Sequence, residues 1–269
     1  MKKYLLSVGL LTTILLLGSC GEESSFLTAV LPAEGARVKF VHAAPDAPGV
    51  AIFVNDKKVS GTLTVAPTIP GTIAYGGIFP ASDYAVLPAG SAKVKITTPT
   101  VGDATLLSGD VNLEAGKYYT VIATGLAPTY TPYVVQDNLP EISGNKVFFR
   151  VINLVPNSTN TEVSIAGQTA ITDIKPQGGG DKFIAYELPN TIGVTFGFPV
   201  VVKINGSSTT TTAGSITSST TINYSGVTPG RVYTIVTRGL LGTQVIDNTN
   251  KPVVTASRFA PTVSTYINR

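Results

Sequence analysis

The sequence predicts an all-β fold, arranged as two tandem domains behind an N-terminal export signal. Short runs rich in Val, Ile, Thr, Tyr and Phe recur between turn residues, which is the pattern of β-strands. Apolar residues at the helical spacing i, i+3 and i+4 hardly occur after residue 20. A set of sequence landmarks also appears twice, in the same order. Together these observations indicate two copies of one β-rich domain.

The clearest strand candidates are seven runs: Val38–Ala43, Val50–Val54, Lys93–Thr97, Tyr118–Thr124, Val147–Leu154, Val200–Ile204 and Val232–Thr237. Charged and apolar side chains alternate strictly from Lys93 to Ile96. Because successive side chains of a strand point to opposite faces, we expect Val94 and Ile96 to face a core and the two lysines to face water.

The internal repeat is defined by three pairs of matching segments: Phe40–Asp46 with Val151–Asn157, Gly116–Leu126 with Gly230–Leu240, and Val135–Asn138 with Val245–Asn248. The offsets of 111, 114 and 110 residues mean that the copies differ only by small loop insertions and deletions. Each copy spans roughly 105 residues, the size of a seven-stranded β-sandwich. We therefore expect domains at residues 37–141 and 142–269, each able to unfold cooperatively by itself.

The first twenty residues have the three parts of a bacterial export signal. Lys2 and Lys3 form a positively charged start. Leu5–Leu17 is an apolar run too short for a membrane-spanning helix, which needs about 20 residues. The Leu-Gly-Ser-Cys ending at Cys20 resembles the lipobox of bacterial lipoproteins, in which the cysteine is acylated and becomes the mature N-terminus.

The lipobox resemblance implies a signal peptide at residues 1–19, diacylglyceryl and palmitate chains on Cys20, and a lipid-anchored flexible tether at residues 20–36. An ordinary secretory signal that contains a cysteine by chance is the alternative. Gly21–Glu23 resembles the surface-export signal of Bacteroidetes lipoproteins, although a plain solvated linker explains it equally well. We expect a protein of the bacterial cell envelope, lipid-anchored to the outer membrane, and leave its surface exposure open.

Charge and cysteine content narrow the partners and the chemistry. Without Lys2 and Lys3 the 19 basic residues fall to 17 against 16 acidic ones, so the mature chain carries a net charge of +1. It has no basic stripe, so nucleic acid is not an expected partner. Cys20 is the only cysteine and lipid would consume it, which leaves neither a disulfide nor a thiolate metal site. The expected partners are the membrane, through covalent lipid, and an unidentified surface protein or glycan.

The first copy carries a recognisable family pattern in four segments: Arg37–Pro48, Val50–Asn55, Tyr84–Gly90 and Gly116–Gly125. These segments resemble the DUF4397 family of exported bacterial proteins. The second copy departs from the pattern, with Asn153, Asn157 and Thr159 in place of its His, Asp and second Pro. The resemblance implies immunoglobulin-like β-sandwiches, often in tandem, on lipoproteins or cell-wall proteins. It implies no activity.

His42 is the only histidine, and Asp46 follows it by four residues. A metal site needs three or four convergent ligands, and the sequence offers neither a second His nor a free Cys to complete one. Strand alternation places His42 on the face of Val38 and Phe40, so we expect a semi-buried, hydrogen-bonded imidazole. The second copy has Asn153 at this position, which suits a polar tether better than a catalyst.

Three loop segments have both a structural and a functional interpretation. Pro45–Pro48 and Pro156–Thr159 are predicted to be turns, because Pro fixes φ and Asp or Asn bonds to the nearby backbone. A calcium loop using Asp46 and Asp56 is the weaker alternative, since calcium needs six to eight oxygens. Gly178–Gly180 lacks the Lys-Ser/Thr and the helix of a phosphate loop, so we expect a flexible loop tip.

No catalytic, cofactor-binding or metal-binding residue is predicted. The chain has no Gly-x-Ser-x-Gly elbow, and any Ser-His triad would depend on His42 alone. Glu22 and Glu23 form the only adjacent acidic pair, in the tether. Ser207–Thr221 is Ser/Thr-rich, which fits a polar hairpin or a glycosylated segment.

Aromatic residues bear on sugar binding. Tyr118, Tyr119 and Tyr233 are expected in cores, whereas Tyr130 and Tyr133 lie in a Pro-interrupted segment and are expected to be exposed. The absence of Trp weakens a carbohydrate-binding interpretation. The sequence therefore favours a non-enzymatic envelope lipoprotein with a binding, adhesion or structural role. The alternative is an extracellular hydrolase acting on polysaccharide, or a carbohydrate-binding accessory protein.

Overall fold

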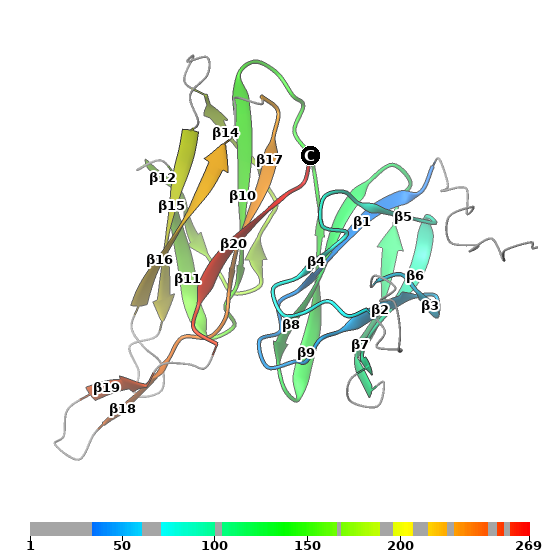
Figure 1. The fold of residues 1–269 in the computed structure, drawn as a ribbon, viewed down its shortest axis with the longest axis horizontal. Helices are drawn as coiled ribbons and strands as arrows, with labels where there is room; N and C mark the ends of the chain where they lie inside the picture. The colour runs from blue at the N-terminus through cyan, green and yellow to red at the C-terminus, as the bar shows by residue number, and fades with distance from the viewer. Residues whose placement is uncertain are drawn as a thin grey trace, which may run out of the picture. The chain divides into compact units, whose positions relative to one another are not determined.

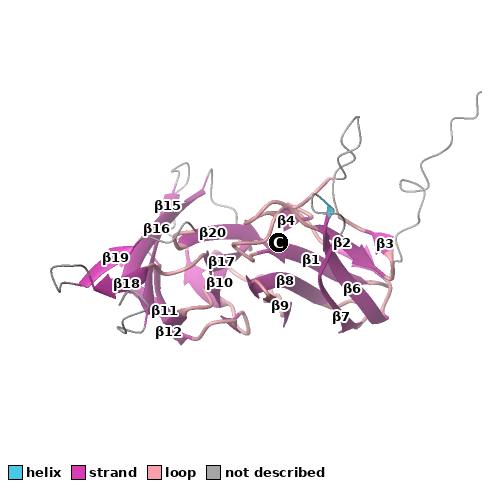
Figure 2. Cartoon of the chain, turned by 90° about the horizontal axis from the view of Figure 1, so that it is seen from below, coloured by secondary structure: helices cyan, strands magenta, loops and turns pink. Residues whose placement is uncertain are grey.

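The structure, a computed structural model, describes residues 34–60, 71–99, 104–165, 168–188, 196–206, 215–224, 229–246, 252–255 and 259–269. The predicted signal peptide, Cys20 and the tether up to residue 33 lie outside this part of the chain. Strands dominate the described residues (Figure 2). These residues contain no α-helix, and Pro99 is the one among them in a 3₁₀ turn. Accordingly, none of them forms a helix long and apolar enough to span a membrane. The all-β prediction is confirmed, and the strands form two β domains.

The first β domain consists of two sheets (Figure 1). One has the order β4-β1-β8-β9, with β5 also paired to β1, and the other has the order β3-β2-β6-β7. Strands β1 and β8 run parallel. The strands are β1 (Ala36–His42), β2 (Ala51–Val54), β3 (Lys57–Lys58), β4 (Ile78–Phe79), β5 (Ala85–Leu87), β6 (Gly90–Thr98), β7 (Ala104–Leu113), β8 (Tyr118–Leu126) and β9 (Thr129–Gln136).

The second β domain repeats this arrangement. One sheet has the order β13-β10-β17-β20, with β14 also paired to β10, and the other has the order β12-β11-β15-β16. Strands β10 and β17 are parallel, as β1 and β8 are, and β18 and β19 form a separate hairpin. The strands are β10 (Lys146–Leu154), β11 (Ser158–Ile165), β12 (Gln168–Ile174), β13 (Gly178–Gly179), β14 (Ile184–Glu187), β15 (Phe196–Gly206), β16 (Ser215–Tyr224), β17 (Val232–Arg238), β18 (Thr243–Ile246), β19 (Pro252–Thr255) and β20 (Thr262–Ile267).

Each of the seven predicted runs overlaps a strand, namely β1, β2, β6, β8, β10, β15 or β17. In β6 the predicted alternation is confirmed: Val94 and Ile96 are buried, Lys93 is exposed and Lys95 is half-buried. Such alternation follows from packing one face of a sheet against a core while the other face meets water.

Strands β1 and β10 are buried on both faces. Along β1, Val38 and Phe40 join the core of the first domain, whereas Lys39 and Val41 occupy the opposite face. A further apolar cluster covers that face and is shared by the two domains: Val41, Ala43, Ile122, Val135, Ile152, Leu154, Val236 and Tyr266. We call this shared layer, with the polar side chains that lie in it, the junction. Coverage on both faces explains why these parallel strands are apolar almost throughout.

The first two repeat landmarks occupy matching places in the fold. Phe40 pairs with Val121 on β8, and Val151 pairs with Ile235 on β17. The register between the parallel strands is therefore the same in both domains. Lys39 is the counterpart of Arg150, since Lys39 lies opposite Thr120 and Arg150 lies opposite Thr234.

The third landmark is not matched in the fold, which corrects the sequence alignment. Val135 pairs with β8, but Val245 pairs with Val253 in the β18–β19 hairpin. Strand β20 lies beside β17 instead. Two similar four-residue segments thus have different structural roles, because a short match does not determine which strand completes a sheet.

Asn268 is consequently the counterpart of Asp137. The backbone N–H of Asp137 donates to Tyr118 O at 2.7 Å, and that of Asn268 donates to Val232 O at 2.8 Å. Both residues directly follow the strand that borders the parallel pair. The sequence comparison alone had placed Asp247 in this position.

All strand pairs of the described residues join strands within 36–136 or within 146–267. The boundary between residues 141 and 142 and the immunoglobulin-like topology stay predictions.

Candidate functional site

Two positively charged side chains are completely buried at the junction. Lys39 and Arg150 each have 0% of their surface exposed. Charged side chains are rarely buried without partners, since removing them from water is costly. The contacts of Lys39 and Arg150 therefore identify the polar groups that stabilise these buried charges.

Five side chains form a closed ring across the junction. Arg150 Nε donates to Thr234 Oγ1 at 2.7 Å, and Thr234 Oγ1 donates to Asn268 Oδ1 at 2.6 Å. Asn268 Nδ2 donates to Tyr84 Oη, and Tyr84 Oη donates to Asp137 Oδ2, both at 2.7 Å. Arg150 Nη2 lies 2.7 Å from Asp137 Oδ1 and closes the ring. Because Tyr84 and Asp137 belong to the first domain and the other three to the second, the ring joins the domains at two places.

The surroundings keep the two ring charges in place. Burial alone would lower the pKa of Arg150, but Tyr266 and Asp137 outweigh it and raise the pKa. The same guanidinium donates from Nη1 to Gly180 O at 3.2 Å. Thr120 Oγ1 donates to Asp137 Oδ2 at 2.7 Å, which further stabilises the carboxylate. The ion pair is thus supported by neutral hydrogen bonds on both sides, as a buried pair requires.

Lys39 has no carboxylate partner at hydrogen-bond distance among the described residues. Its Nζ donates to two backbone carbonyls, Asp83 O at 2.7 Å and Pro80 O at 3.2 Å. It also lies 4.8 Å from the ring centroid of Tyr84, a cation–π contact. Burial lowers the pKa of Lys39 to about 8, and the charges of Asp83 and Asp137 oppose that shift.

His42 is buried, with 1% of its surface exposed, and so lies deeper than the semi-buried position that the strand alternation predicted. Its Nε2 lies 3.0 Å from Pro48 O, and Nδ1 has no hydrogen-bond partner among the described residues. The imidazole contacts the ring of Tyr75 edge-on at 6.1 Å, and the guanidinium of Arg238 lies 4.7 Å above that same ring. Burial lowers the pKa of His42 despite the bond to Pro48, so the neutral form is favoured.

Asn153, the counterpart of His42, is fully hydrogen-bonded. Its Nδ2 donates to Ser158 Oγ and to Ile174 O, both at 3.0 Å. Its Oδ1 accepts from Val155 N at 3.1 Å and from Thr237 Oγ1 at 3.0 Å. In both domains, the polar side chain at this position therefore hydrogen-bonds to the segment that follows β1 or β10.

The two predicted Pro-containing turns are confirmed, and both are tied to a distant loop. Asp46 Oδ2 accepts from the N–H of Ala127 at 2.9 Å, and Asn157 Oδ1 accepts from the N–H of Leu241 at 3.0 Å. Asp56 instead forms an exposed ion pair with Lys95 at 3.2 Å. Asp46 and Asp56 therefore have separate partners and do not form the alternative calcium loop.

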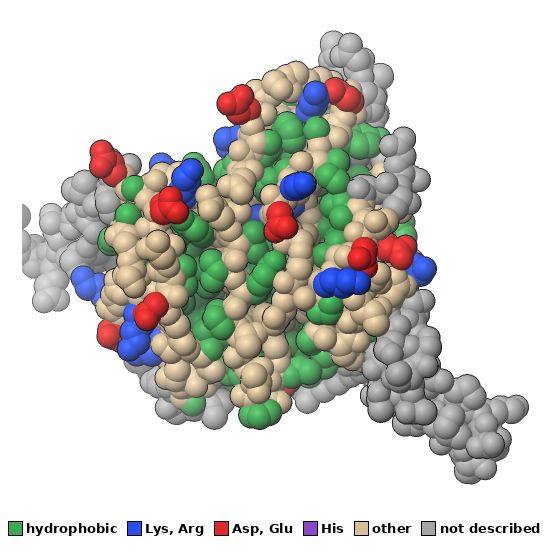
Figure 3. All heavy atoms as spheres, turned by 180° about the vertical axis from the view of Figure 1, so that it is seen from behind, with side chains coloured by type: hydrophobic (Ala, Val, Ile, Leu, Met, Phe, Trp, Pro, Cys, Tyr) green, Lys and Arg blue, Asp and Glu red, His purple; other side chains and the backbone are tan. Residues whose placement is uncertain are grey.

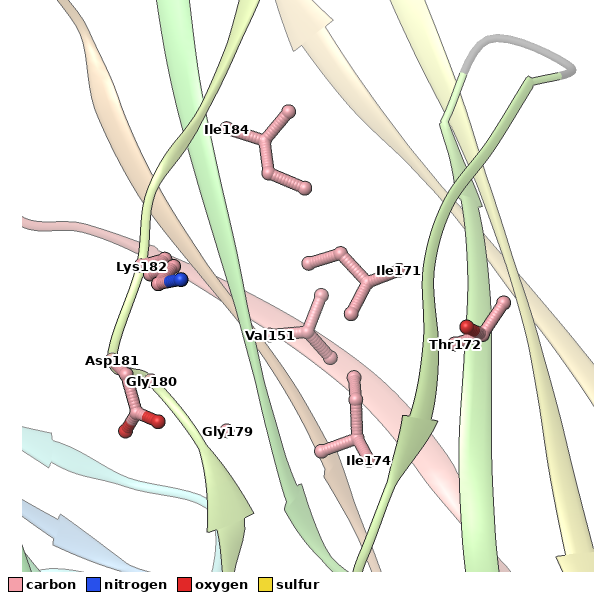
Figure 4. A pocket seen from close by; sticks show the side chains of 9 residues that line it. All are labelled: Val151, Ile171, Thr172, Ile174, Gly179, Gly180, Asp181, Lys182 and Ile184. Carbon is pink, nitrogen blue, oxygen red and sulfur yellow. The ribbon is translucent and has the colours of Figure 1, made fainter.

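A pocket of about 440 Å³ opens between the two sheets of the second domain (Figure 4). Val151, Ile171, Ile174 and Ile184 point into it. The remaining lining residues are Thr172, Gly179, Gly180, Asp181 and Lys182. The pocket is thus apolar inside, with charged residues at its rim.

Gly178–Gly180 is not a flexible loop tip, contrary to the sequence prediction. Gly178 and Gly179 form β13, which pairs with β10, and Gly180 is buried. A Cβ on Gly179 would collide with the carbonyl oxygen of Val151. The glycines therefore serve a close approach of two backbones, which no larger residue permits.

Tyr130 and Tyr133 are not exposed as predicted, because both lie on β9 and are half-buried. Tyr130 packs against the core of the first domain, and Tyr133 Oη donates to Gly179 O of the second at 2.9 Å. Pro132 does not end this strand, since β9 is an edge strand, where the missing N–H is tolerated. Of the predicted core tyrosines, Tyr119 and Tyr233 are buried and Tyr118 is half-buried.

Uncharged side chains dominate the face seen in Figure 3, where basic and acidic residues lie in small groups, often side by side. The described residues contain no group of three or more His, Cys, Asp or Glu side chains that could hold a metal. Of the segment Ser207–Thr221, residues 207–214 lie outside the described part and residues 215–221 lie on β16. Its glycosylation stays an open question.

Sequence reasoning missed the junction charges. One signal could have found Lys39 and Arg150: each lies between apolar residues inside a strand, at equivalent positions of the two copies. No comparable signal marks Asn268, because it becomes a neighbour of Tyr84 only in the folded chain.

Comparison with known proteins gives a family for part of the chain. The family model DUF4397, a domain of unknown function, matches residues 36–164, so the chain carries one DUF4397 domain there. No curated protein matches the sequence. Among solved structures, a candidate cell adhesion protein from Bacteroides fragilis NCTC 9343 is 11% identical, with 82% of this chain and 96% of that one covered. Its TM-score of 0.18 is too low for the likeness to bear on fold or function.

Proposed function

We propose that this chain is a non-enzymatic lipoprotein of the bacterial cell envelope, in which two DUF4397-like β-sandwiches act as one binding, adhesion or spacer module. The observation that carries the proposal is the environment of His42, the one histidine of the sequence. His42 is buried and packed against Tyr75, and its counterpart Asn153 performs the same fastening role. A general base must reach the group it deprotonates. An imidazole held in this way supports a structural role.

The buried charges support the same proposal. Arg150 and Asp137 bond to each other and to neutral side chains of the junction, so their charges serve to join the two domains. A joined pair of domains keeps the outer surfaces of both domains in one fixed orientation relative to each other. That property suits a protein that presents a surface or separates two layers.

The proposed location in the cell envelope rests on the sequence. A lipoprotein cysteine carries two or three acyl chains, and each buried CH₂ contributes about 0.8 kcal/mol, so anchoring through Cys20 would be stable. The tether ends at residue 36, where β1 begins.

The proposal is tested with the full chain expressed in a bacterial host fed an alkyne-tagged fatty acid. We expect the wild type to carry the tag and to sediment with outer membranes, and Cys20→Ser to lose both properties. Whole cells carrying either form are then incubated with a glycan array and with host-matrix proteins. Binding of the cells to a glycan or to a matrix protein, without hydrolysis of any glycan, supports the proposed binding module.

Two results would overturn this proposal. One is an untagged wild type that is released as freely as Cys20→Ser. The other is turnover of a polysaccharide that is lost in His42→Asn while that variant stays folded, which would establish the hydrolase alternative.

A further inference from the structure

The two domains meet through the same face of the fold. Val135 and Tyr266 are counterparts, because they lie opposite Thr120 on β8 and Thr234 on β17. The strand registers relate the other apolar residues of the junction in the same way. The cluster therefore consists of four pairs of counterparts: Val41 with Ile152, Ala43 with Leu154, Ile122 with Val236, and Val135 with Tyr266.

The buried cations repeat this correspondence. Lys39 Nζ lies 4.8 Å from the ring centroid of Tyr84, and Arg150 Cζ lies 4.9 Å from that of Phe183. The two rings directly precede β5 and β14, which pair with β1 and β10 in the same register. Each domain thus places a cation over its own aromatic ring at the same point of the shared face.

Contacts across the junction are also reciprocal. Gln177, which leads into β13 of the second domain, donates from Nε2 to Thr131 Oγ1 on β9 of the first at 2.8 Å. In the opposite direction, Tyr75 in the segment that leads into β4 contacts Arg238 at the end of β17, with the guanidinium 4.7 Å from the ring centroid. Use of one surface on both sides defines an isologous interface, which two identical domains can also form.

The charges decide which of the two faces can pair with itself. Arg150 faces Asp137 across the junction, and the counterparts of these residues are Lys39 and Asn268. At these positions the first domain has a cation and an anion, whereas the second has a cation and a neutral amide. Two second-domain faces would bury two Arg150 side chains without a carboxylate opposite either, which is costly. Two first-domain faces would be complementary.

We propose that the first domain binds the first domain of a second copy of this chain through its junction face, about a twofold axis, whenever its own second domain is displaced. Two Lys39–Asp137 pairs then take the place of the single Arg150–Asp137 pair. Lys39 Nζ has three donors and uses two of them, on Asp83 O and Pro80 O, so one is left for the carboxylate of the other copy. Such a pair leaves both second domains free.

The intact chain favours its own second domain for two reasons. The linker between β9 and β10 is short, so the second domain is present at a high effective concentration. The second domain also contributes larger apolar side chains, since Leu154 is the counterpart of Ala43 and Tyr266 that of Val135. A pair of first domains is therefore packed less tightly and forms only when the second domain leaves the face uncovered.

The test displaces the second domain in the full chain and leaves the first domain unchanged. The chain carries Cys20→Ser, so that no acyl group contributes to association. Arg150→Asp places an anion opposite Asp137, and Val236→Arg places a cation in the apolar cluster. In analytical ultracentrifugation, each variant should sediment with about twice the mass of one chain, as a closed twofold pair requires.

Each displacing variant has a matched control at its counterpart in the first domain. Asp137→Arg opposes Arg150 with a like charge, and Ile122→Arg places a cation in the same cluster. Both controls displace the second domain but also alter the first-domain face, so both should sediment as single chains. Lys39→Met added to Arg150→Asp should restore the mass of one chain, whereas the exposed Lys93→Met should leave the pair intact.

A cross-link then locates the paired surface. Tyr133 Oη donates to Gly179 O across the junction, and Ile78 is the register counterpart of Gly179. In the Arg150→Asp background, Ile78→Cys chains mixed with Tyr133→Cys chains should therefore be joined by a short bis-maleimide. Lys93→Cys chains, whose thiol lies on the other sheet, should not be joined to Tyr133→Cys chains.

Three outcomes overturn the proposal. The first is a displacing variant with the circular dichroism of the wild type that sediments as a single chain. The second is equal pairing of the first-domain controls, and the third is equal cross-linking through Lys93→Cys. The inference goes beyond the proposed function, and its measurements involve neither acylation nor binding to glycans or matrix proteins, so either can fail alone.

Discussion

Arg150 Nη2 lies 2.7 Å from Asp137 Oδ1, and neither side chain has any solvent-exposed surface. Arg150 comes from β10 and Asp137 from the residue after β9, so this ion pair connects the second domain to the first. A buried pair with neutral hydrogen bonds around it contributes little to net stability but makes the loss of either partner costly. The junction is therefore where the protein is most sensitive to single substitutions.

Replacing Arg150 with Met should destabilise the whole chain by about 3–5 kcal/mol, because the Asp137 carboxylate would stay buried without its cation. Urea unfolding of the full chain measures the effect. Lys146→Met on the same strand is the control. Lys146 pairs with Glu187 at 3.1 Å, with side-chain exposures of 35% and 70%, so its loss should cost less than about 1 kcal/mol.

The double variant Arg150→Met with Asp137→Asn should recover part of the loss, since no charge is then left unpaired at the junction. Equal losses of unfolding free energy in Arg150→Met and Lys146→Met would show that the buried pair matters no more for stability than the exposed one.

Cutting the chain between the domains should leave the two pieces bound to each other. The sequence repeat predicts that residues 36–141 and 142–269 unfold cooperatively by themselves, but separation would expose the apolar cluster and unpair Arg150 from Asp137. We therefore expect a folded chain with a protease site at exposed Ser143 to elute as one particle after cleavage. Elution as two stable, separate monomers would instead show that the sequence-based expectation of independent halves is right.

Acid should destabilise the wild type through His42. Its pKa in the folded chain is lowered from 6.5 by burial, so the unfolded chain binds the proton more readily. Stability is then fully present above about pH 6.5 and falls as the pH drops below it. His42→Asn, which copies Asn153, should lose about 1 kcal/mol at pH 7.5 and lack this acid-dependent part. Urea midpoints at pH 7.5, 6.5 and 5.5 give the comparison, and parallel pH profiles would rule out His42 as the cause.

Alkaline pH should stabilise the wild type through Lys39. Its pKa falls from 10.5 to about 8 in the folded chain, so between these values the unfolded chain binds more protons. Stability should therefore rise as the pH increases above about 8. Lys39→Met should lack this rise, whereas the exposed Lys93→Met should keep it. Thermal unfolding at pH 7.5, 8.5 and 9.5 measures the difference, and an equal rise in Lys39→Met would contradict the prediction.

The sequence by itself determined the local structure. Alternation in Lys93–Thr97 and the apolar runs Val38–Ala43 and Val147–Leu154 predicted strands that the structure contains, because each residue's preference for core or water is local. It also predicted the turns at Asp46 and Asn157 and a semi-buried His42, which the structure buries completely. These features depend on side-chain polarity and backbone geometry within a few residues.

Only the tertiary structure decided which surfaces meet. Nothing in the strand pattern distinguishes a face that packs within its own domain from one that packs on the next. The contacts of Lys39 with Tyr266 and of Arg150 with Asp137 therefore became visible only in the fold. The same holds for Asn268, which replaces the expected Asp247 beside the ring, and for Gly180, which lines the pocket of the second domain. Such features arise from contacts between residues far apart in the chain, and their energies depend on geometry that the order of residues does not state.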